Sequence, residues 1–328
     1  ETSEKSKSMD IMKKYIDTGK KDTRSGFGVG LLEAGRADSR VVALTADLKG
    51  SLKMDAFAAE FPERFIQCGI AEANMVGAAA GLAITGKIPF IGSFAEFVTG
   101  RVYDQLRQEV AYGKVNVKIA SSHAGITLGE DGATHQTMED LALMRALPEM
   151  VVINPCDFNQ TKNATLAAAK YVGPVYLRFG RPSVPNFTDP DEEFIIGKAI
   201  VLSEGKDVTL LATGHTVWES LLAAEALEAE GISAEVINVA TIKPLDVDAL
   251  VASARKTGAV VVAEEHNMAG GLGEAVAGAF ARTFPTPIEF VNGEDRFGQS
   301  GTPAVLMKAY GLDAEHIAAA ARKVLGRK

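Results

Sequence analysis

Short apolar runs alternate with longer helical patterns along the chain. In the first half, apolar runs of strand length lie at 41–47, 64–68, 87–94, 115–122, 150–155 and 174–179. Patterns typical of helices lie between them, at 24–36, 72–85, 97–112, 138–146 and 157–171, and Thr137 opens the fourth of these, with Glu139 and Asp140 favouring its positive end. Because strands that alternate with helices usually pair in parallel, this half predicts a parallel sheet covered by helices.

A second α/β unit follows a proline-rich segment. Residues 181–194 carry three prolines, four acidic residues and no periodicity, which marks a linker that we place at 183–196. Beyond it, strand patterns at 207–214, 233–240, 259–265 and 287–292 alternate with helical patterns at 216–230, 246–257, 271–283, 303–310 and 313–325. We therefore expect an α/β protein with two domains, each a mostly parallel sheet flanked by helices: a polar lead-in over 1–20, a first domain over 21–182 and a second over 197–328.

Length and composition agree with two globular domains. The chain has 328 residues, of which 47% are hydrophobic and 23% charged. Its net charge of −8 gives no global attraction to nucleic acid or anionic membranes.

The longest nearly uncharged stretch, 68–86, contains Glu72 and Asn74 and does not predict a membrane span. Two cysteines, Cys68 and Cys156, are too few for a disulfide framework, and the polar start lacks a signal core, so we expect a cytoplasmic protein.

Glu72 is the only charged residue between Cys68 and Gly86. It stands where a predicted strand passes into a helix rich in glycine and alanine. One interpretation is a carboxylate that complements the positive end of the helix dipole. The other is a carboxyl group removed from water, whose raised pKa lets it share a proton with a ligand nitrogen. The small residues after it leave room for another chain or a flat ligand.

Two of the five histidines lie in one glycine-rich loop that follows a predicted strand. The loop, 121–140, holds His123, Glu130, Asp131 and His135. Its irregular spacing lacks the helical i, i+4 pair of zinc enzymes and disfavours a metal site. A polar surface loop is a second interpretation. The third is a loop that binds hydroxyl groups and moves protons near neutral pH.

Two other features carry weaker signals. Phe94 and Phe97 follow a strand end, where ligand sites of open parallel sheets gather, although phenylalanines at this spacing are more often part of a core. The string GGLG at 270–273 precedes a helix but lacks the full dinucleotide-binding spacing, so we interpret it as a tight strand-to-helix turn.

Several strings together resemble the transketolase family, and most closely the shorter subunit of split transketolases. They are DTR (22–24), TADLKGS (45–51), GIAEAN (69–74), GSFAEF (92–97), HAGITLGEDGATHQ (123–136), LRFGRP (177–182), HNMAGGLGEA (266–275) and FGQSGTP (297–303). GEDG-x-THQ is specific, whereas GIAEA is shared with deoxyxylulose-phosphate synthases and the β subunits of 2-oxo acid dehydrogenases. The resemblance spans nearly the whole chain and implies a pyrimidine-binding domain followed by a transketolase C-terminal domain.

The resemblance implies thiamine diphosphate as the cofactor. Glu72 matches the catalytic carboxyl group that hydrogen-bonds and protonates the aminopyrimidine ring, and Phe97, helped by Phe94, matches the residue that packs against that ring. Asp47 matches an aspartate of the cofactor region. The implied reaction is transfer of a two-carbon ketol unit from a ketose phosphate to an aldose phosphate.

The resemblance also implies a substrate site. Arg24, Ser51 and Arg178 match contacts to the phosphate end of a sugar phosphate, for which guanidinium groups provide charge-assisted hydrogen bonds. The residues that match contacts to the sugar hydroxyls and reacting carbons are His123, Asp131 and His135, with both histidines as catalytic groups. The alternative for Arg178 is an ion pair with an acid such as Asp189 or Asp191.

The sequence departs from single-chain transketolases in ways that imply a partner. The family's GDG string with its later asparagine pair is missing, so the Mg²⁺-diphosphate site would come from an N-terminal subunit, in an α2β2 assembly with self-association of this chain. Where single-chain transketolases have the string IREH, this chain has Ile70-Ala71-Glu72-Ala73. This chain also has an extra residue within 99–105, which leaves the register of the helix after Phe97 open.

Two alternatives to a transketolase subunit remain. A β subunit of a 2-oxo acid dehydrogenase, or an enzyme like deoxyxylulose-phosphate synthase, shares the architecture and Glu72 but has less use for GEDG-x-THQ. A non-catalytic scaffold is disfavoured because Glu72, Asp131 and both loop histidines are present.

Overall fold

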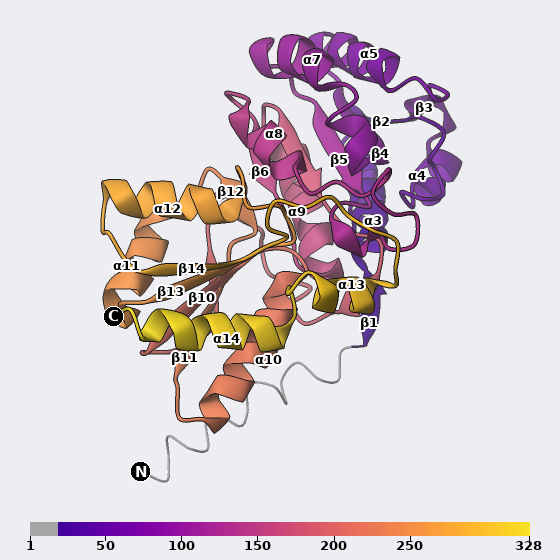
Figure 1. The fold of residues 1–328 in the computed structure, drawn as a ribbon. Helices are drawn as coiled ribbons and strands as arrows, with labels where there is room; N and C mark the ends of the chain where they lie inside the picture. The colour runs from indigo at the N-terminus through magenta and orange to yellow at the C-terminus, as the bar shows by residue number, and fades with distance from the viewer. Residues whose placement is uncertain (1–18) are drawn as a thin grey trace.

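Two layered α/β domains follow one another along the chain (Figure 1). The structure is a computed structural model and describes residues 19–328. The predicted lead-in over 1–20 therefore lies almost wholly outside the described residues. The expected fold class, two mostly parallel sheets flanked by helices, is confirmed. No helix of the described chain is long and apolar enough to cross a membrane.

The first domain is built on a seven-stranded sheet with the order β12-β6-β7-β5-β4-β2-β3. Its strands are β2 (Val41–Thr45), β3 (Phe65–Gln67), β4 (Ile88–Phe94), β5 (Lys118–Ser122), β6 (Val151–Ile153), β7 (Val175–Arg178) and β12 (Thr241–Lys243). All neighbours pair in parallel except β12 with β6. All six strands predicted in the first half of the chain are present.

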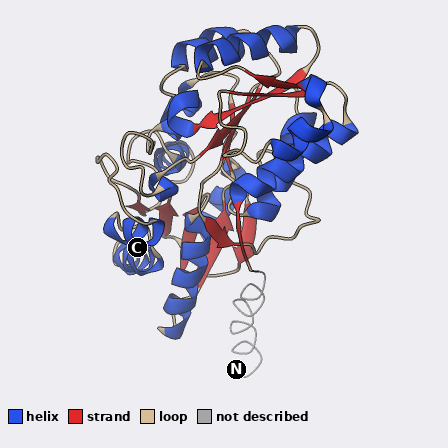
Figure 2. Cartoon of the chain, turned by 90° about the vertical axis from the view of Figure 1, so that its right-hand side faces the viewer, coloured by secondary structure: helices blue, strands red, loops and turns tan. Residues whose placement is uncertain are grey.

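Helices cover both faces of this sheet, because alternate strand residues point to opposite sides (Figure 2). Val41 and Ala43 pack on one face with α3 and α9, whereas Val42 and Leu44 pack on the other with α5 and α8. The helical elements of this domain are α3 (Thr23–Ala37), α4 (Asp55–Glu60), η1 (Pro62–Arg64), α5 (Glu72–Ile84), α6 (Ala95–Val98), α7 (Tyr103–Gln105), η2 (Leu106–Tyr112), η3 (Ile126–Leu128), α8 (Asp140–Ala146) and α9 (Phe158–Lys170).

Two predicted helices differ from the structure. The helix expected over 97–112 is broken into α6, α7 and the π-helical segment η2, with a turn between α6 and α7. An inserted residue that does not fit the 3.6-residue repeat is accommodated by such a break and a wider helix. The helix expected from Thr137 begins instead at Asp140, and its N-cap, Glu139, makes no side-chain capping bond.

The second domain has a five-stranded sheet with the order β14-β13-β10-β11-β9. Its strands are β9 (Ile200–Ser203), β10 (Val208–Ala212), β11 (Ala234–Asn238), β13 (Val260–Ala263) and β14 (Ile288–Val291), and its helices are α10 (Thr216–Ala229), α11 (Val247–Thr257), α12 (Leu272–Arg282), α13 (Pro303–Ala309) and α14 (Ala314–Leu325). Only β9 runs antiparallel to its neighbour. The predicted strands and helices are all present, and β9 is an addition to the prediction.

The two domains are joined by more than the linker. Strand β12 comes from the second half of the chain but pairs with β6 of the first sheet. One hydrophobic core is continuous between the domains, since Leu141 of α8 shares it with Ile237 and Leu272. The predicted linker is also partly regular: β8 (Ser183–Pro185) pairs with β1 (Lys20–Asp22) in a two-stranded antiparallel sheet.

Candidate active site

The predicted site residues follow the carboxyl ends of neighbouring strands. In the sheet order β5-β4-β2-β3, His123 follows β5, Phe94 ends β4, Asp47 follows β2, and Glu72 begins the helix after β3. Carboxyl ends of parallel strands share one edge of a sheet, where ligands of open α/β sheets bind. The tertiary structure thus gathers residues that are up to 76 positions apart, because 123 − 47 = 76.

Glu72 is the first residue of α5, and its side chain is only 4% exposed. Its Oε1 accepts a hydrogen bond from Nη1 of Arg101 at 2.9 Å. The Arg101 guanidinium also lies over the Phe97 ring, 4.1 Å from its centroid. The carboxylate thus stands at the start of a helix and is also withdrawn from water against Arg101, so both interpretations of Glu72 stay open.

Four rings form a cluster beside this carboxylate. Phe94 stacks on Phe97 with centroids 5.8 Å apart and on His123 with centroids 3.8 Å apart. His135 presents an edge to Phe97 at 5.4 Å and to Phe94 at 6.5 Å. The two phenylalanines and two histidines of the prediction thus share one cluster, half of which comes from the glycine-rich loop.

His123 is held in an unusual backbone conformation, with φ at +59°. A left-handed conformation at a residue other than glycine is a cost that proteins often accept at functional sites. Burial lowers the pKa of His123 to about 3, and the positive charges of Arg24, Arg181 and His135 act in the same direction. The His123 imidazole is therefore neutral at pH 7, with Nδ1 bonded to Ser122 Oγ at 2.7 Å.

Arg24 and Arg181 form a positive corner next to His123. Arg24 donates from Nη1 to the backbone oxygen of Ser51 at 3.2 Å and pairs with Asp22. Burial lowers the pKa of Arg24, and the charge of Arg181 adds to this effect while Asp22 opposes it. Arg181 is 41% exposed and bonds Glu130 Oε2 at 3.0 Å. The corner therefore has two cations, each balanced by a carboxylate that is itself partly exposed.

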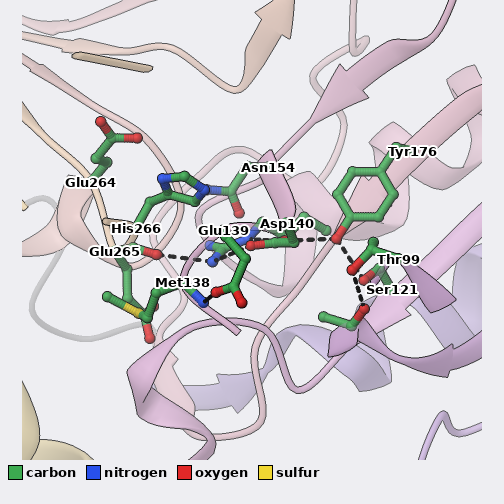
Figure 3. A network of polar contacts seen from close by, with 12 residues as sticks. Thr99, Ser121, Met138, Glu139, Asp140, Asn154, Tyr176, Glu264, Glu265 and His266 are labelled. Carbon is green, nitrogen blue, oxygen red and sulfur yellow. Dashed lines mark hydrogen bonds and ion pairs between the residues drawn. The ribbon is translucent and has the colours of Figure 1, made fainter. Parts of the chain in front are cut away.

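Arg178 does not belong to this corner, which corrects the sequence-based assignment. Its side chain is 3% exposed, and its Nε lies 2.7 Å from Oδ2 of the fully buried Asp140. Asp140 also accepts from the Tyr176 hydroxyl, which bonds Ser121, as Figure 3 shows. The alternative, an ion pair, was closer to the structure, but the partner is Asp140 of α8 and not an acid of the linker.

The remaining predicted residues lie at the rim. Asp131 is exposed, in the turn between Gly129 and Gly132, two glycines with positive φ. Asp47 is also exposed and has φ at +61°, and its backbone N–H bonds Oε1 of Gln67 at 2.7 Å. Both aspartates are therefore exposed, Asp47 shortly after β2 and Asp131 in the loop that follows β5.

The GGLG string lies in the second domain. GGLG forms the strand-to-helix turn that the sequence predicts, since α12 begins at Leu272 with Gly271 as its N-cap. Both oxygens of Glu264 accept the first N–H groups of this helix, from Leu272 and Gly273. Within 19–328 no three His, Cys, Asp or Glu side chains are grouped to hold a metal ion.

Sequence reasoning missed Arg101 and Arg181. Arg101 lies in the turn that breaks the expected helix, and the only sequence signal for it was the extra residue in 99–105. Arg181 is in the same LRFGRP string as Arg178, three positions later. Nothing in the string distinguishes the two arginines, because only the packing decides which one is buried.

Two family models match consecutive parts of the chain. A model described as the transketolase pyrimidine binding domain matches residues 19–186, and one described as the transketolase C-terminal domain matches residues 197–317.

Individual proteins are similar over nearly the whole chain. A putative transketolase C-terminal section from Methanocaldococcus jannaschii is 48% identical over 91% of this chain and 94% of its own length. A 6-deoxy-6-sulfo-D-fructose transketolase subunit from a Clostridium species is 46% identical over 91% of this chain and 92% of its own length. A solved structure described as a split gene transketolase, an inactive β4 tetramer, is 47% identical, with a TM-score of 0.87 over 94% of this chain and 99% of that chain.

Proposed function

Because the chain belongs to the transketolase family, as a section that carries its pyrimidine binding and C-terminal domains, we propose that it is one subunit of a thiamine-diphosphate-dependent transketolase. The complete enzyme transfers a two-carbon ketol unit from a ketose to an aldose, each with an anionic end group. The observation that carries the proposal is the buried Glu72 carboxylate, which Arg101 joins to the Phe97 ring that stacks on Phe94.

The residues present fit the aminopyrimidine ring of the cofactor. A carboxylate that is almost withdrawn from water bonds a ring nitrogen strongly, and a stacked phenylalanine pair offers an apolar face to a flat ring. Glu72 would hold the ring nitrogen and its proton, with Phe97 and Phe94 beside the ring and Asp47 at the edge of the cofactor region. When bound, thiamine diphosphate supplies the nucleophilic carbon and stabilises the two-carbon fragment between donor and acceptor.

Arg101 would regulate access to Glu72. Its guanidinium occupies Oε1 and covers the Phe97 ring, which are the two features that a pyrimidine would use. Since 48% of the Arg101 side chain is exposed, it can swing into water at little cost. Ligand binding would then exchange one charge-assisted bond to Glu72 for another.

The substrate would lie between the ring cluster and the positive corner. Arg24 and Arg181, with Ser51 beside them, would bind the anionic end group, and Arg181 replaces Arg178 in this role. The neutral His123, with His135 and Asp131, would orient hydroxyl groups and move protons at the reacting carbons. The anion is a phosphate or, as the name of the Clostridium relative suggests, a sulfonate.

A partner subunit would complete the enzyme. It would bring the site for Mg²⁺ and the cofactor's diphosphate, and the assembly would be α2β2, with two copies of this chain in contact. Such an enzyme would act in carbohydrate metabolism in the cytoplasm. The split organisation of the relatives supports this part of the proposal.

The test is reconstitution. The chain is mixed with an N-terminal subunit of about 270–300 residues that carries the GDG and asparagine-pair motifs, a size that corresponds to one α/β domain with extensions. We expect two-carbon transfer between sugar phosphates only in the mixture. Full activity of the lone chain would contradict the need for a partner, and decarboxylation of a 2-oxo acid with transfer to a lipoyl domain would instead favour the dehydrogenase alternative.

A further inference from the structure

We propose that Glu265, a residue of the C-terminal domain, positions the substrate loop 123–136 of the pyrimidine-binding domain. This gives the second domain, which supplies no predicted substrate or cofactor contact, a role in substrate recognition. The catalytic consequence rests on the proposed function, whereas the contact itself does not.

The Glu265 carboxylate crosses the domain boundary to reach the backbone of the loop. Its Oε1 accepts the N–H of Thr127 at 2.7 Å. A Cβ atom on Gly125 would overlap the same carboxylate, and Gly125 has φ at +79°. The loop can therefore approach Glu265 this closely only because a glycine stands at position 125.

The carboxylate is itself held from the other side. His215 Nδ1 lies 3.5 Å from Glu265 Oε2 and 3.3 Å from Oγ1 of Thr127. Nη2 of Arg178 donates to the backbone oxygen of Glu265 at 2.9 Å. Burial alone would raise the pKa of Glu265, but the hydrogen bond and charge of His215, with the charge of Arg178, bring it below its ordinary value. Glu265 is thus a charged acceptor in the interior, where a hydrogen bond to an ion is strong.

A second anchor lies at the far end of the loop. Nε2 of the buried Gln136 donates to the backbone oxygens of Ile126 and Gly129 and also to that of Gln299 in the C-terminal domain, at 3.0, 3.1 and 3.0 Å. His123, Asp131 and His135 thus stand on a loop that is fixed to the second domain at two points. Small displacements of such contacts are costly, because substrate groups must be held in near-reactive geometry.

The neighbouring Glu264 provides a matched control. It is as deeply buried as Glu265 and also accepts backbone N–H groups, but those belong to α12 of its own domain. It fits against Gly271 as Glu265 fits against Gly125. A change that acts only through general destabilisation of the domain should therefore affect the two positions alike.

The experiment compares Glu265→Gln with Glu264→Gln in the full chain and in the reconstituted enzyme. Amide hydrogen exchange of peptides covering 123–136 reports on the loop without any need for activity. We expect exchange at Thr127 to rise about 10-fold in Glu265→Gln, because the glutamine oxygen still accepts this N–H but the charge that roughly doubles the strength of the bond is gone. Glu264→Gln should leave these peptides unchanged and loosen the start of α12 instead.

The kinetic measurement separates positioning from simple support of the fold. In Glu265→Gln we expect a raised KM for the sugar phosphate and unchanged binding of thiamine diphosphate. In Glu264→Gln we expect both the KM and the binding of thiamine diphosphate to match the wild type. Equal loop protection in the two variants, or a loosened loop with a wild-type KM, would overturn the proposal. If the wild-type mixture has no transketolase activity, the proposed function fails, while the exchange comparison still decides whether Glu265 holds the loop.

A glycine pair gives a second route if Glu265→Gln does not fold. Gly125→Ala puts a Cβ against the carboxylate, whereas Gly231→Ala has a similar positive φ of +83° but nothing within 4 Å of its new Cβ. Both carry the same kind of backbone strain. We expect only Gly125→Ala to increase exchange across the loop, and equal exchange in the two variants would count against the contact.

Discussion

Arg178 and Asp140 form a buried ion pair in which Nε of the arginine lies 2.7 Å from Oδ2 of the aspartate. The arginine ends β7, the aspartate begins α8, and the arginine's second nitrogen reaches the C-terminal domain through the backbone of Glu265. Burial by itself would raise the pKa of Asp140, but the charge and hydrogen bond of Arg178 bring it below the ordinary value. The pair therefore joins the sheet, a helix and the second domain at one point.

Replacing Arg178 with Leu should destabilise the chain by about 3–5 kcal/mol, because an unpaired buried carboxylate remains. Urea unfolding of the full chain measures this. The control is Arg322→Leu, whose ion pair with Glu230 is exposed to solvent and which should therefore change the free energy of unfolding far less. Adding Asp140→Leu to Arg178→Leu should recover part of the loss. A single variant as stable as the control would contradict the structural role of Arg178.

Replacing Arg24 or Arg181 with Ala should reduce kcat/KM for phosphorylated sugars by roughly 10- to 150-fold, the equivalent of about 1.5–3 kcal/mol for a charge-assisted contact. Hydroxypyruvate and glycolaldehyde, which have no phosphate, should react almost as in the wild type. Steady-state kinetics of the reconstituted enzyme with both substrate classes provides the measurement. Equal losses with both classes would remove the support for an anion site at this corner.

Replacing Glu72 with Gln should slow exchange of the cofactor's C2 proton by roughly 10²- to 10⁴-fold in the reconstituted enzyme, because the amide no longer shares a proton with the pyrimidine ring. Nuclear magnetic resonance after acid quenching follows this exchange. Glu109→Gln is the matched control, since Glu109 is an exposed carboxylate that faces α5 at Gly77. A wild-type rate in Glu72→Gln would leave only the helix-dipole interpretation.

His123 should make the stability of the chain depend on pH. Its pKa is about 3 in the folded state and about 6.5 when unfolded, so the unfolded chain binds a proton first as the pH falls. The stability that this pKa difference contributes is fully present above pH 6.5 and is lost progressively as the pH falls to 3, with about 2 kcal/mol lost at pH 5. Asparagine also tolerates the left-handed conformation. The His123→Asn variant should therefore lose about 2 kcal/mol less stability than the wild type between pH 7 and pH 5. Parallel pH dependence of the two proteins would contradict this assignment.

Local patterns were sufficient for most of the fold because they record which face of each element is buried. The continuous apolar run of β2 and the helical spacing of Phe27, Leu31 and Ala34 in α3 identify a strand and a helix without any knowledge of their partners. The region 95–112 escaped this reasoning. Its apolar residues Val98, Val102, Leu106 and Val110 recur every four residues, as in one helix, but the backbone between them contains a turn and a π-helical segment.

The sequence by itself determined the two α/β domains, the placement of Glu72, Phe94 and His123 at strand ends, and the resemblance that connects them. Only the tertiary structure decided between Arg178 and Arg181, because that choice depends on Asp140, an acid 38 positions away at the buried start of α8. Only the tertiary structure likewise shows that Arg101 bonds Glu72 and that Glu265 bonds the substrate loop. Local periodicity reports the burial of a residue, whereas the partner of a buried charge is set by which distant elements pack together.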